Sequence, residues 1–231
     1  HIDVHASPWA EQLKAIDMIA RHFDGTLHFI DTVFEPWQVM LRNICGEHLM
    51  DLVEHEPDAL LDALDVVTDN VLAYSREAMK AGASGIFMST FGARSVLSED
   101  IYRTFAYPFV ERIFREIEGQ AIMNTAHVHG SGIYTDDAVR LPVHCISYED
   151  TDEANPSIAE LREVFDGTVM GGLDKDRMTL VTPAEAVRNA EQAIRNGGPT
   201  RFLMAPGCSL PTELYPRSAE LIVETVQKAA G

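Results

Sequence analysis

The chain has 231 residues, enough for one large α/β domain. Acidic residues outnumber Lys and Arg by 36 to 18, and the net charge of −18 argues against nucleic acid or an anionic membrane surface as a partner. Three cysteines are too few for a disulfide framework, and no apolar run is long enough to cross a bilayer, so we expect a cytoplasmic protein.

Short β-rich runs alternate with helical patterns along the whole chain. Strands are predicted over residues 26–33, 85–88, 121–127, 143–147, 168–170 and 201–204. Helices are predicted over residues 57–80, from Ser98 to 119, from an Asn155-Pro156 cap to 165, over 182–197 behind a Thr182–Glu185 capping box, and over 215–229.

Alternating strands and helices predict a parallel sheet covered by helices. An open doubly wound sheet would carry a Gly-rich phosphate fingerprint after its first strand, and this sequence has none. The other architecture is a (β/α)₈ barrel, which needs eight strands, so two would have to be missing from this chain.

The clearest chemical pattern is His127-Val128-His129, at the end of a predicted strand. Residues two apart in a strand point to the same face, so the two imidazoles can converge. Cys208 follows another predicted strand, and the carboxyl ends of parallel strands meet at one edge of the sheet. Two imidazoles and one thiolate suit Zn²⁺ and leave a fourth position open, as in catalytic sites. Polar residues hydrogen-bonded at strand ends are the alternative.

Carboxylates also follow several predicted strands, and any of them could be a fourth ligand or a general base: Asp31, Glu35, Glu149, Asp150 and Asp174. Taken singly, each is more often a solvated acid in a loop. Asp174 stands apart because the two glycines before it indicate close backbone approach. Glu149 and Asp174 are therefore the predicted catalytic carboxylates, whereas Cys145 and Cys45 are assigned to packing.

From about Thr26 onward the chain resembles the uroporphyrinogen decarboxylase superfamily, which also contains corrinoid- and cobalamin-dependent methyltransferases. The matching landmarks, in order along the chain, are Glu35-Pro-Trp37, Tyr74 with Ala81-Gly-Ala83, Phe91-Gly92, Leu97-Ser98, the run from Tyr102 to Pro108, Gly171-Gly-Leu-Asp174 and Ala205-Pro-Gly-Cys208. The resemblance implies a TIM-type (β/α)₈ barrel without its first two strands. Residues 1–231 would then be one barrel domain, the C-terminal two-thirds of a longer protein.

Three departures separate this sequence from the true decarboxylases. Ser89 occupies the position of their aspartate, Arg42 stands where a tyrosine follows their Pro-Trp motif, and Gly207-Cys208 replaces their His-Gly. The methyltransferase branch matches better, because its zinc motif is His-x-Cys followed by a distant Pro-Gly-Cys. His127 and Cys208 match that motif, and His129 replaces its first cysteine. The exchange makes the site one unit more positive, so the methyl acceptor need not be the usual thiol.

The resemblance therefore implies a zinc-dependent methyltransferase that moves a methyl group from a methylcorrinoid to a thiol-type acceptor, with Zn²⁺ held by His127, His129 and Cys208. Two alternatives remain open: a decarboxylase of a polar acid that uses carboxylates such as Asp174, and a non-catalytic corrinoid-binding barrel. The expected partners are a small-molecule substrate, a corrinoid protein, and either a second copy of the chain or the missing N-terminal fragment.

Overall fold

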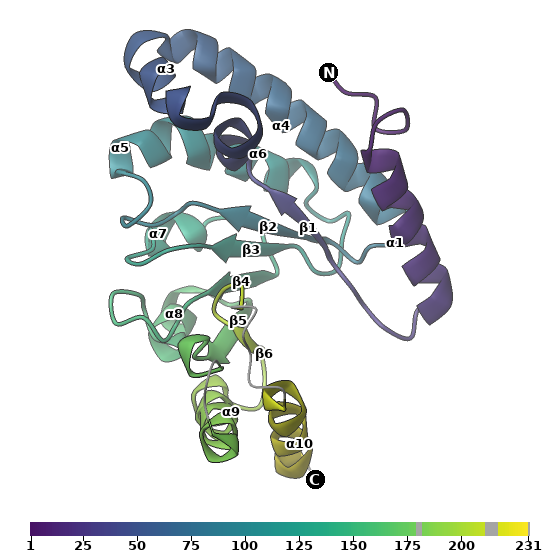
Figure 1. The fold of residues 1–231 in the computed structure, drawn as a ribbon, viewed down its shortest axis with the longest axis vertical. Coiled ribbons are helices and arrows are strands. Elements are labelled where there is room, and N and C mark those ends of the chain that lie inside the picture. Colours follow the sequence, from purple (N-terminus) through teal and green to yellow (C-terminus); the bar gives the residue numbers. More distant parts are fainter. Residues whose placement is uncertain (179–181, 211–216, 231) are drawn as a thin grey trace.

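The computed structural model describes residues 1–178, 182–210 and 217–230, and its centre is one sheet of parallel strands (Figure 1). The strands are β1 (Asp31–Phe34), β2 (Ile86–Thr90), β3 (Thr125–Val128), β4 (Cys145–Tyr148), β5 (Thr168–Leu173) and β6 (Phe202–Pro206). They lie in chain order, and within the described residues β1 and β6 each pair on one side only. The predicted six-stranded part of a barrel is confirmed.

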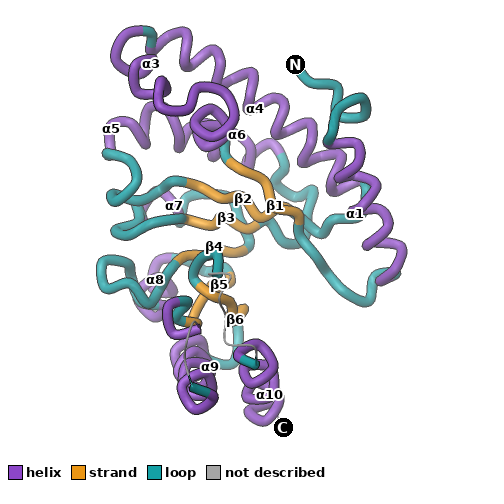
Figure 2. The backbone as a smooth tube through the Cα atoms, viewed as in Figure 1, coloured by secondary structure: helices purple, strands orange, loops and turns teal. Residues whose placement is uncertain are grey.

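Helices follow the curve of the sheet from α4 and α6, near β1 and β2, to α9 and α10, near β5 and β6 (Figure 2). The α-helices are α1 (Trp9–Phe23), α2 (Pro36–Val39), α3 (Leu49–His55), α4 (Pro57–Lys80), α5 (Glu99–Ile101), α6 (Tyr107–Glu116), α7 (Thr135–Ala138), α8 (Ile158–Val164), α9 (Pro183–Gly197) and α10 (Ser218–Ala230). Short π- or 3₁₀-helical segments are η1 (Met40–Cys45), η2 (Gly46–His48), η3 (Tyr102–Ala106) and η4 (Asp176–Met178). Among the described helices, none is long and apolar enough to cross a membrane.

The register of the strands separates the core from the functional face of the sheet. Met88, Ala126, Ile146 and Val169 pair across β2 to β5 and are completely buried. Adjacent residues of a strand point to opposite faces, so the next row along the strands faces away from this core. That next row lines the cavity described below.

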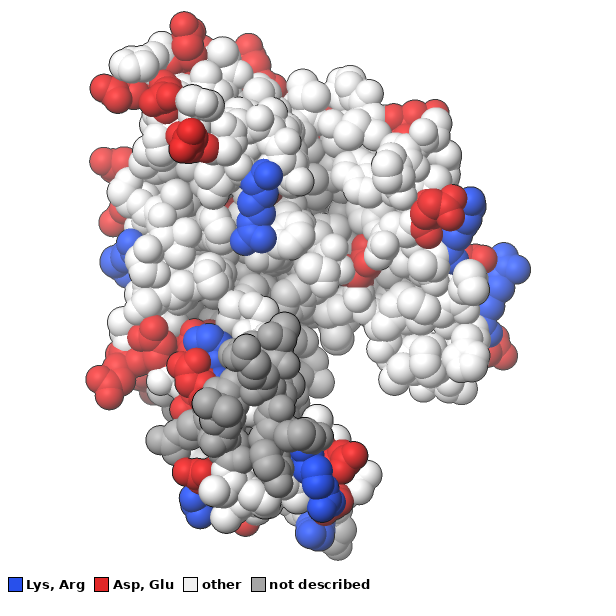
Figure 3. All heavy atoms as spheres, viewed as in Figure 1, with Lys and Arg blue, Asp and Glu red and all other residues white. Residues whose placement is uncertain are grey.

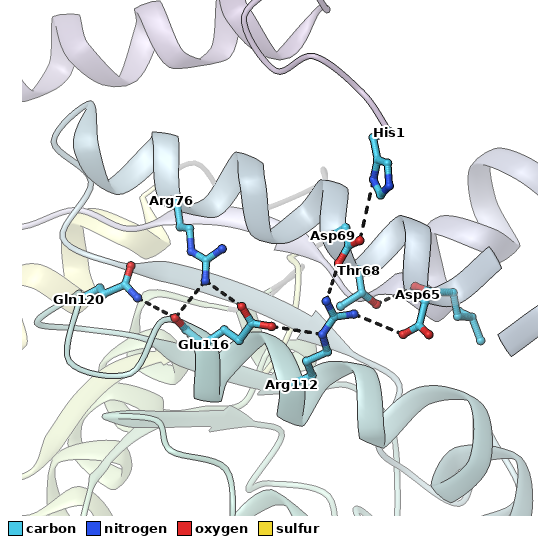
Figure 4. Close-up of polar contacts among 9 residues, drawn as sticks. His1, Asp65, Thr68, Asp69, Arg76, Arg112, Glu116 and Gln120 are labelled. Carbon is cyan, nitrogen blue, oxygen red and sulfur yellow. Dashed lines mark hydrogen bonds and ion pairs between the residues drawn. The ribbon is translucent and has the colours of Figure 1, made fainter. Parts of the chain in front are cut away.

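An ion-pair cluster on the surface joins α4 to α6 (Figure 4). Arg112 of α6 contacts both Asp65 and Asp69 of α4, and Glu116 lies 3.2 Å from Arg112 and 2.8 Å from Arg76. These groups are partly exposed, so each pair contributes less than about 1 kcal/mol. The cluster links the exposed sides of α4 and α6, whose buried apolar side chains share one hydrophobic core.

The structure corrects several predicted boundaries. The predicted helix after Ser98 is three segments, α5, η3 and α6, and the π-helical turn of η3 precedes Pro108, which has no N–H to donate. The cap of α8 is Ser157, which forms a capping box with Glu160, so the prediction of an Asn155-Pro156 cap is wrong. The Thr182 capping box is confirmed.

The beginning of the chain differs most from the prediction. Only residues 31–34 of the predicted 26–33 strand are in the ladder, because Phe29 makes a single backbone bond, accepting from Ser84. Helix α1 was not predicted, although Leu13 and Ile16 are spaced for one buried face. Tyr215, the predicted first residue of the last helix, lies outside the described residues, and α10 begins at Ser218.

Candidate metal centre

His127 lies in β3, nearly buried at 6% exposure, between Ser89 of β2 and Ser147 of β4 in the strand register. Its Nδ1 atom is 3.1 Å from the Ser147 hydroxyl oxygen. The Phe87 ring stacks on the imidazole with centroids 5.1 Å apart. These contacts orient the ring, as second-shell partners do in known metal sites, and leave Nε2 as the nitrogen that can contact Cys208 or a metal ion.

His129 lies just beyond the end of β3, where its backbone N–H donates to the Thr90 carbonyl at 2.9 Å. Its Nδ1 atom is 3.2 Å from the Cys208 sulfur. Gly130 follows with a φ of +117°, and a Cβ there would lie 2.7 Å from a methyl carbon of Val96. The sharp turn after His129 therefore requires glycine.

Cys208 follows β6 in a loop that lies against the loop after β4. A Cβ on Gly207 would lie 2.6 Å from the Cα of Glu149, so the two loops approach this closely only because residue 207 is glycine. Glu149 forms an ion pair with Lys175, which follows β5. The segments that follow β4, β5 and β6 are thus packed against one another next to Cys208.

The ligand atoms of His127, His129 and Cys208 all lie within 4.8 Å of one another, and no other such group of three occurs in the described ranges. In a tetrahedral zinc site the ligand atoms are about 3.5 Å apart, given bonds of about 2.1 Å to nitrogen and 2.3 Å to sulfur. The 4.8 Å limit exceeds this tetrahedral separation by about 1.3 Å, a difference that small side-chain rotations can remove. Two imidazoles and one thiolate are also a donor set that zinc prefers. The residues fit the ion.

The charges of the three groups are coupled. Hydrogen bonds from His127 and His129 lower the pKa of the Cys208 thiol from 9.0 to about 5. The same contact with Cys208 raises the pKa of His129. At neutral pH the sulfur is therefore a thiolate, the form in which cysteine binds metals and attacks electrophiles.

These side chains open into a cavity of about 470 Å³ at the carboxyl edge of the sheet. One row of paired residues forms its wall across five strands: Phe34, Ser89, His127, Ser147 and Met170. A cavity at this edge is where barrel enzymes bind their substrates. The structure confirms the prediction that the segments at the ends of β3 and β6 bring the three side chains together at one point.

Neither of the two predicted catalytic carboxylates belongs to the group of three or lines the cavity beside it. Glu149 is paired with Lys175 beside Gly207. Asp174 follows β5, and its backbone N–H and C=O are both bonded to the Asn189 side chain. Both remain candidates for proton transfer or for a fourth ligand.

The other acidic residues considered from the sequence are not the solvated loop acids expected there. Asp31 is nearly buried and accepts a hydrogen bond from the Tyr74 hydroxyl at 2.7 Å. Glu35 is completely buried, and burial raises its pKa to about 8. Burial also raises the pKa of Asp150, which accepts from the Gly172 N–H at 2.6 Å. Glu35 and Asp150 follow β1 and β4 as expected, whereas Asp31 is the first residue of β1 and does not follow the strand.

Sequence reasoning missed two residues that position the site. Ser147 was treated only as the last residue of a predicted strand, although a serine buried in a strand is a polar group that needs a partner. Asn155 was assigned to a helix cap. Its amide instead accepts from the Ile133 N–H at 3.0 Å and donates to the carbonyls of Gly130 and Glu149 at 3.1 and 2.9 Å.

Comparisons with known proteins agree with this fold. Residues 3–229 match the sequence model of a family described as uroporphyrinogen decarboxylase (URO-D). Uroporphyrinogen decarboxylases from Xanthomonas axonopodis pv. citri and Xylella fastidiosa are 28% and 26% identical to the chain, over 93% and 94% of it. The chain spans 64% of the length of these curated relatives.

Two solved structures share the fold at low sequence identity. A methyltransferase from Methanosarcina mazei matches with a TM-score of 0.81 at 17% identity, over 95% of this chain and 64% of that one. A B12-independent methionine synthase from a Shewanella species matches with a TM-score of 0.61 at 14% identity, over 94% of this chain and 67% of that one. At such identities the likeness shows the fold alone.

Proposed function

We propose that this chain, which belongs to the uroporphyrinogen decarboxylase family, is a zinc-dependent methyltransferase-like enzyme that moves a methyl group from a methylcorrinoid to a thiol-type acceptor. The observation that supports the proposal is the group formed by His127, His129 and Cys208 at the edge of the cavity. The methyltransferase name of the Methanosarcina mazei structure points the same way.

Zinc bound by these three side chains would supply Lewis-acid chemistry, lowering the pKa of a thiol that takes the fourth position. The protein prepares the ligands for this. Ser147 and Phe87 hold the His127 ring so that Nε2 faces the site. Cys208 is already a thiolate at neutral pH and is the one anionic ligand of the three.

The cavity wall determines what can approach the acceptor sulfur. Phe34, Phe87 and Met170 present apolar surface around the cluster, and Ser89 adds a hydroxyl. In this proposal a methylcorrinoid, carried by its own protein, approaches from the open side of the cavity. The proton that the acceptor thiol releases would pass to solvent or to Glu149 or Asp174, which follow strands whose ends border the site but do not line the cavity.

The decarboxylase alternative is favoured by a different observation, the names of the curated relatives at 26–28% identity. It would use carboxylates such as Asp174 and release carbon dioxide without a metal. A non-catalytic corrinoid-binding barrel would bind the methyl donor without consuming it. The three functions therefore differ in metal dependence and in product.

The test begins with the metal content of the purified chain, measured by mass spectrometry for the wild type, Cys208→Ala and Cys145→Ala. We expect about one zinc per chain in the wild type and in Cys145→Ala, whose side chain is packed in the core, and a clear loss in Cys208→Ala. Methylcobalamin and a small thiol are then supplied, and the methyl thioether is quantified. Equal zinc in all three proteins, or carbon dioxide release from a polycarboxylate by the zinc-free chain, would reject the proposal.

A further inference from the structure

Arg42, in the π-helical segment η1 after β1, lines the same cavity as Cys208. Its guanidinium carbon lies 5.0 Å from the centre of the Phe34 ring and 5.7 Å from the centre of the Phe91 ring. The Phe91 ring is in turn 5.8 Å from the His129 ring. The arginine is thus held by aromatic stacking on the cavity wall, one ring away from the candidate metal ligands.

No hydrogen bond or ion pair joins Arg42 to another described residue, although the chain has 36 acidic residues. Most of the other arginines are in ion pairs: Arg21, Arg76, Arg103, Arg112, Arg115, Arg140, Arg195, Arg201 and Arg217. Stacking on a ring occupies the face of the guanidinium and leaves its N–H edges available. Those edges have no partner of their own.

Apart from Cys208, no described side chain that lines the cavity carries a negative charge. None of the described residues that line it is Asp or Glu, and Arg42 is its only Lys or Arg. On the face drawn in Figure 3 the acidic side chains lie mostly along the margins. In a chain of net charge −18, a cavity with one unpaired arginine and no carboxylate is better suited to an anion than the acidic surface around it.

We propose that Arg42 binds an anionic group of the methyl acceptor, a carboxylate or a sulfonate, and so selects acceptors that carry a negative charge a few bonds from the reacting sulfur. The guanidinium fork matches the two oxygens of such a group, and charge-assisted pairs of this kind are strong and directional. The thiol part of this acceptor rests on the proposed function, whereas the anion site does not.

The first experiment compares two thiols of equal length on the zinc-loaded chain, 3-mercaptopropionate and the uncharged 3-mercaptopropan-1-ol. Arg42→Gln should weaken binding of the carboxylate thiol tenfold or more and change binding of the alcohol less than twofold, and Arg42→Lys should restore part of the carboxylate affinity. Arg94→Gln is the matched control, because Arg94 also stacks on a ring, that of Tyr134, without lining this cavity.

The second experiment uses neither zinc nor thiol. Propionate and propanesulfonate are titrated into the zinc-free chain, and the Nε–H resonances of Arg42 and Arg94 are followed by NMR. A saturable shift at Arg42 alone supports the site, and the stronger of the two anions identifies the preferred group. This result would stand even if zinc binding or methyl transfer failed. Equal shifts at both arginines, no shift at Arg42, or equal weakening of both thiols in Arg42→Gln would overturn the inference.

Discussion

The Nδ1 atom of His129 lies 3.2 Å from the sulfur of Cys208, although 79 positions separate the two residues in the chain. The contact exists because β3 and β6 run parallel, so that the segments following their carboxyl ends meet at one edge of the sheet. Two further strands lie between them, and the curvature of the sheet brings the outer loops together. The site therefore depends on the curvature of the whole sheet from β3 to β6.

The coupling between Cys208 and the imidazoles predicts selective chemical reactivity in the zinc-free protein. The depressed pKa keeps Cys208 a thiolate above about pH 5, whereas burial raises the pKa of Cys145 to about 12. Iodoacetamide at pH 7 should alkylate Cys208 at least tenfold faster than Cys145, and the rate should fall as the pH drops through 5. Peptide mass spectrometry gives both rates. In His129→Gln the midpoint should move up toward 9, and an unchanged midpoint would contradict the coupling.

We expect the Ser147 hydroxyl to raise the affinity for zinc, because it orients the His127 ring. Ser147→Ala should lower zinc affinity about 10- to 100-fold, because removing a second-shell partner frees the ring. Competition with a chromogenic chelator measures this change. Ser89→Ala is the control on the adjacent strand in the same register row, since its hydroxyl accepts from Gln38 at 3.2 Å. Equal losses in the two variants would show that any small change in the wall perturbs the site.

We expect that removing the Asn155 amide lowers both the stability of the fold and the affinity for zinc. It joins the turn after His129 to the loop after β4 through three hydrogen bonds. Asn155→Ala should reduce the free energy of unfolding by about 3 kcal/mol, close to 1 kcal/mol for each bond. It should also weaken zinc binding. Urea denaturation measures the first effect, and Asn196→Ala, which removes one surface hydrogen bond, serves as the comparison.

Glu35 predicts a dependence of stability on pH. Its carboxyl is completely buried, accepts the Phe91 N–H at 2.6 Å, and has its pKa raised from 4.5 to about 8. A raised folded-state pKa contributes stability that is full below 4.5 and is lost as the pH rises to 8. Between pH 5 and 8 the wild type should therefore lose at least about 1.4 kcal/mol more unfolding free energy than Glu35→Gln. Identical losses in urea titrations would mean that Glu35 is ionised in the folded protein; Glu54→Gln, at an exposed position, is the control.

The sequence predicted the parts of this molecule that repeat a local pattern. The helix over 57–80 and the Thr182 capping box were right to the residue because periodicity, Pro57 and Glu185 act within a few positions. The convergence of the two imidazoles and Cys208 was also predicted, since period two in a strand and the parallel arrangement are enough to bring these side chains together.

What the sequence could not supply depends on contacts between distant segments. Asn155 was taken for a helix cap, because nothing local shows that its amide bonds two loops. Glu35 was grouped with solvated acids, since its burial comes from the packing of α2 and the loop after β2. Helix α1 was the opposite case, because its apolar spacing was present and was overlooked.

The 79-position separation of His129 and Cys208 has a mechanical consequence. A zinc ion bound by both residues would close a long loop of chain that contains strands β4, β5 and β6 and helices α8 and α9. Such a closure reduces the entropy of the unfolded chain, and that reduction grows, though slowly, with loop length. Zinc binding would then link the segment after β6 to the segment after β3. Proteolysis between residues 150 and 200 should therefore be slower with zinc bound than without it.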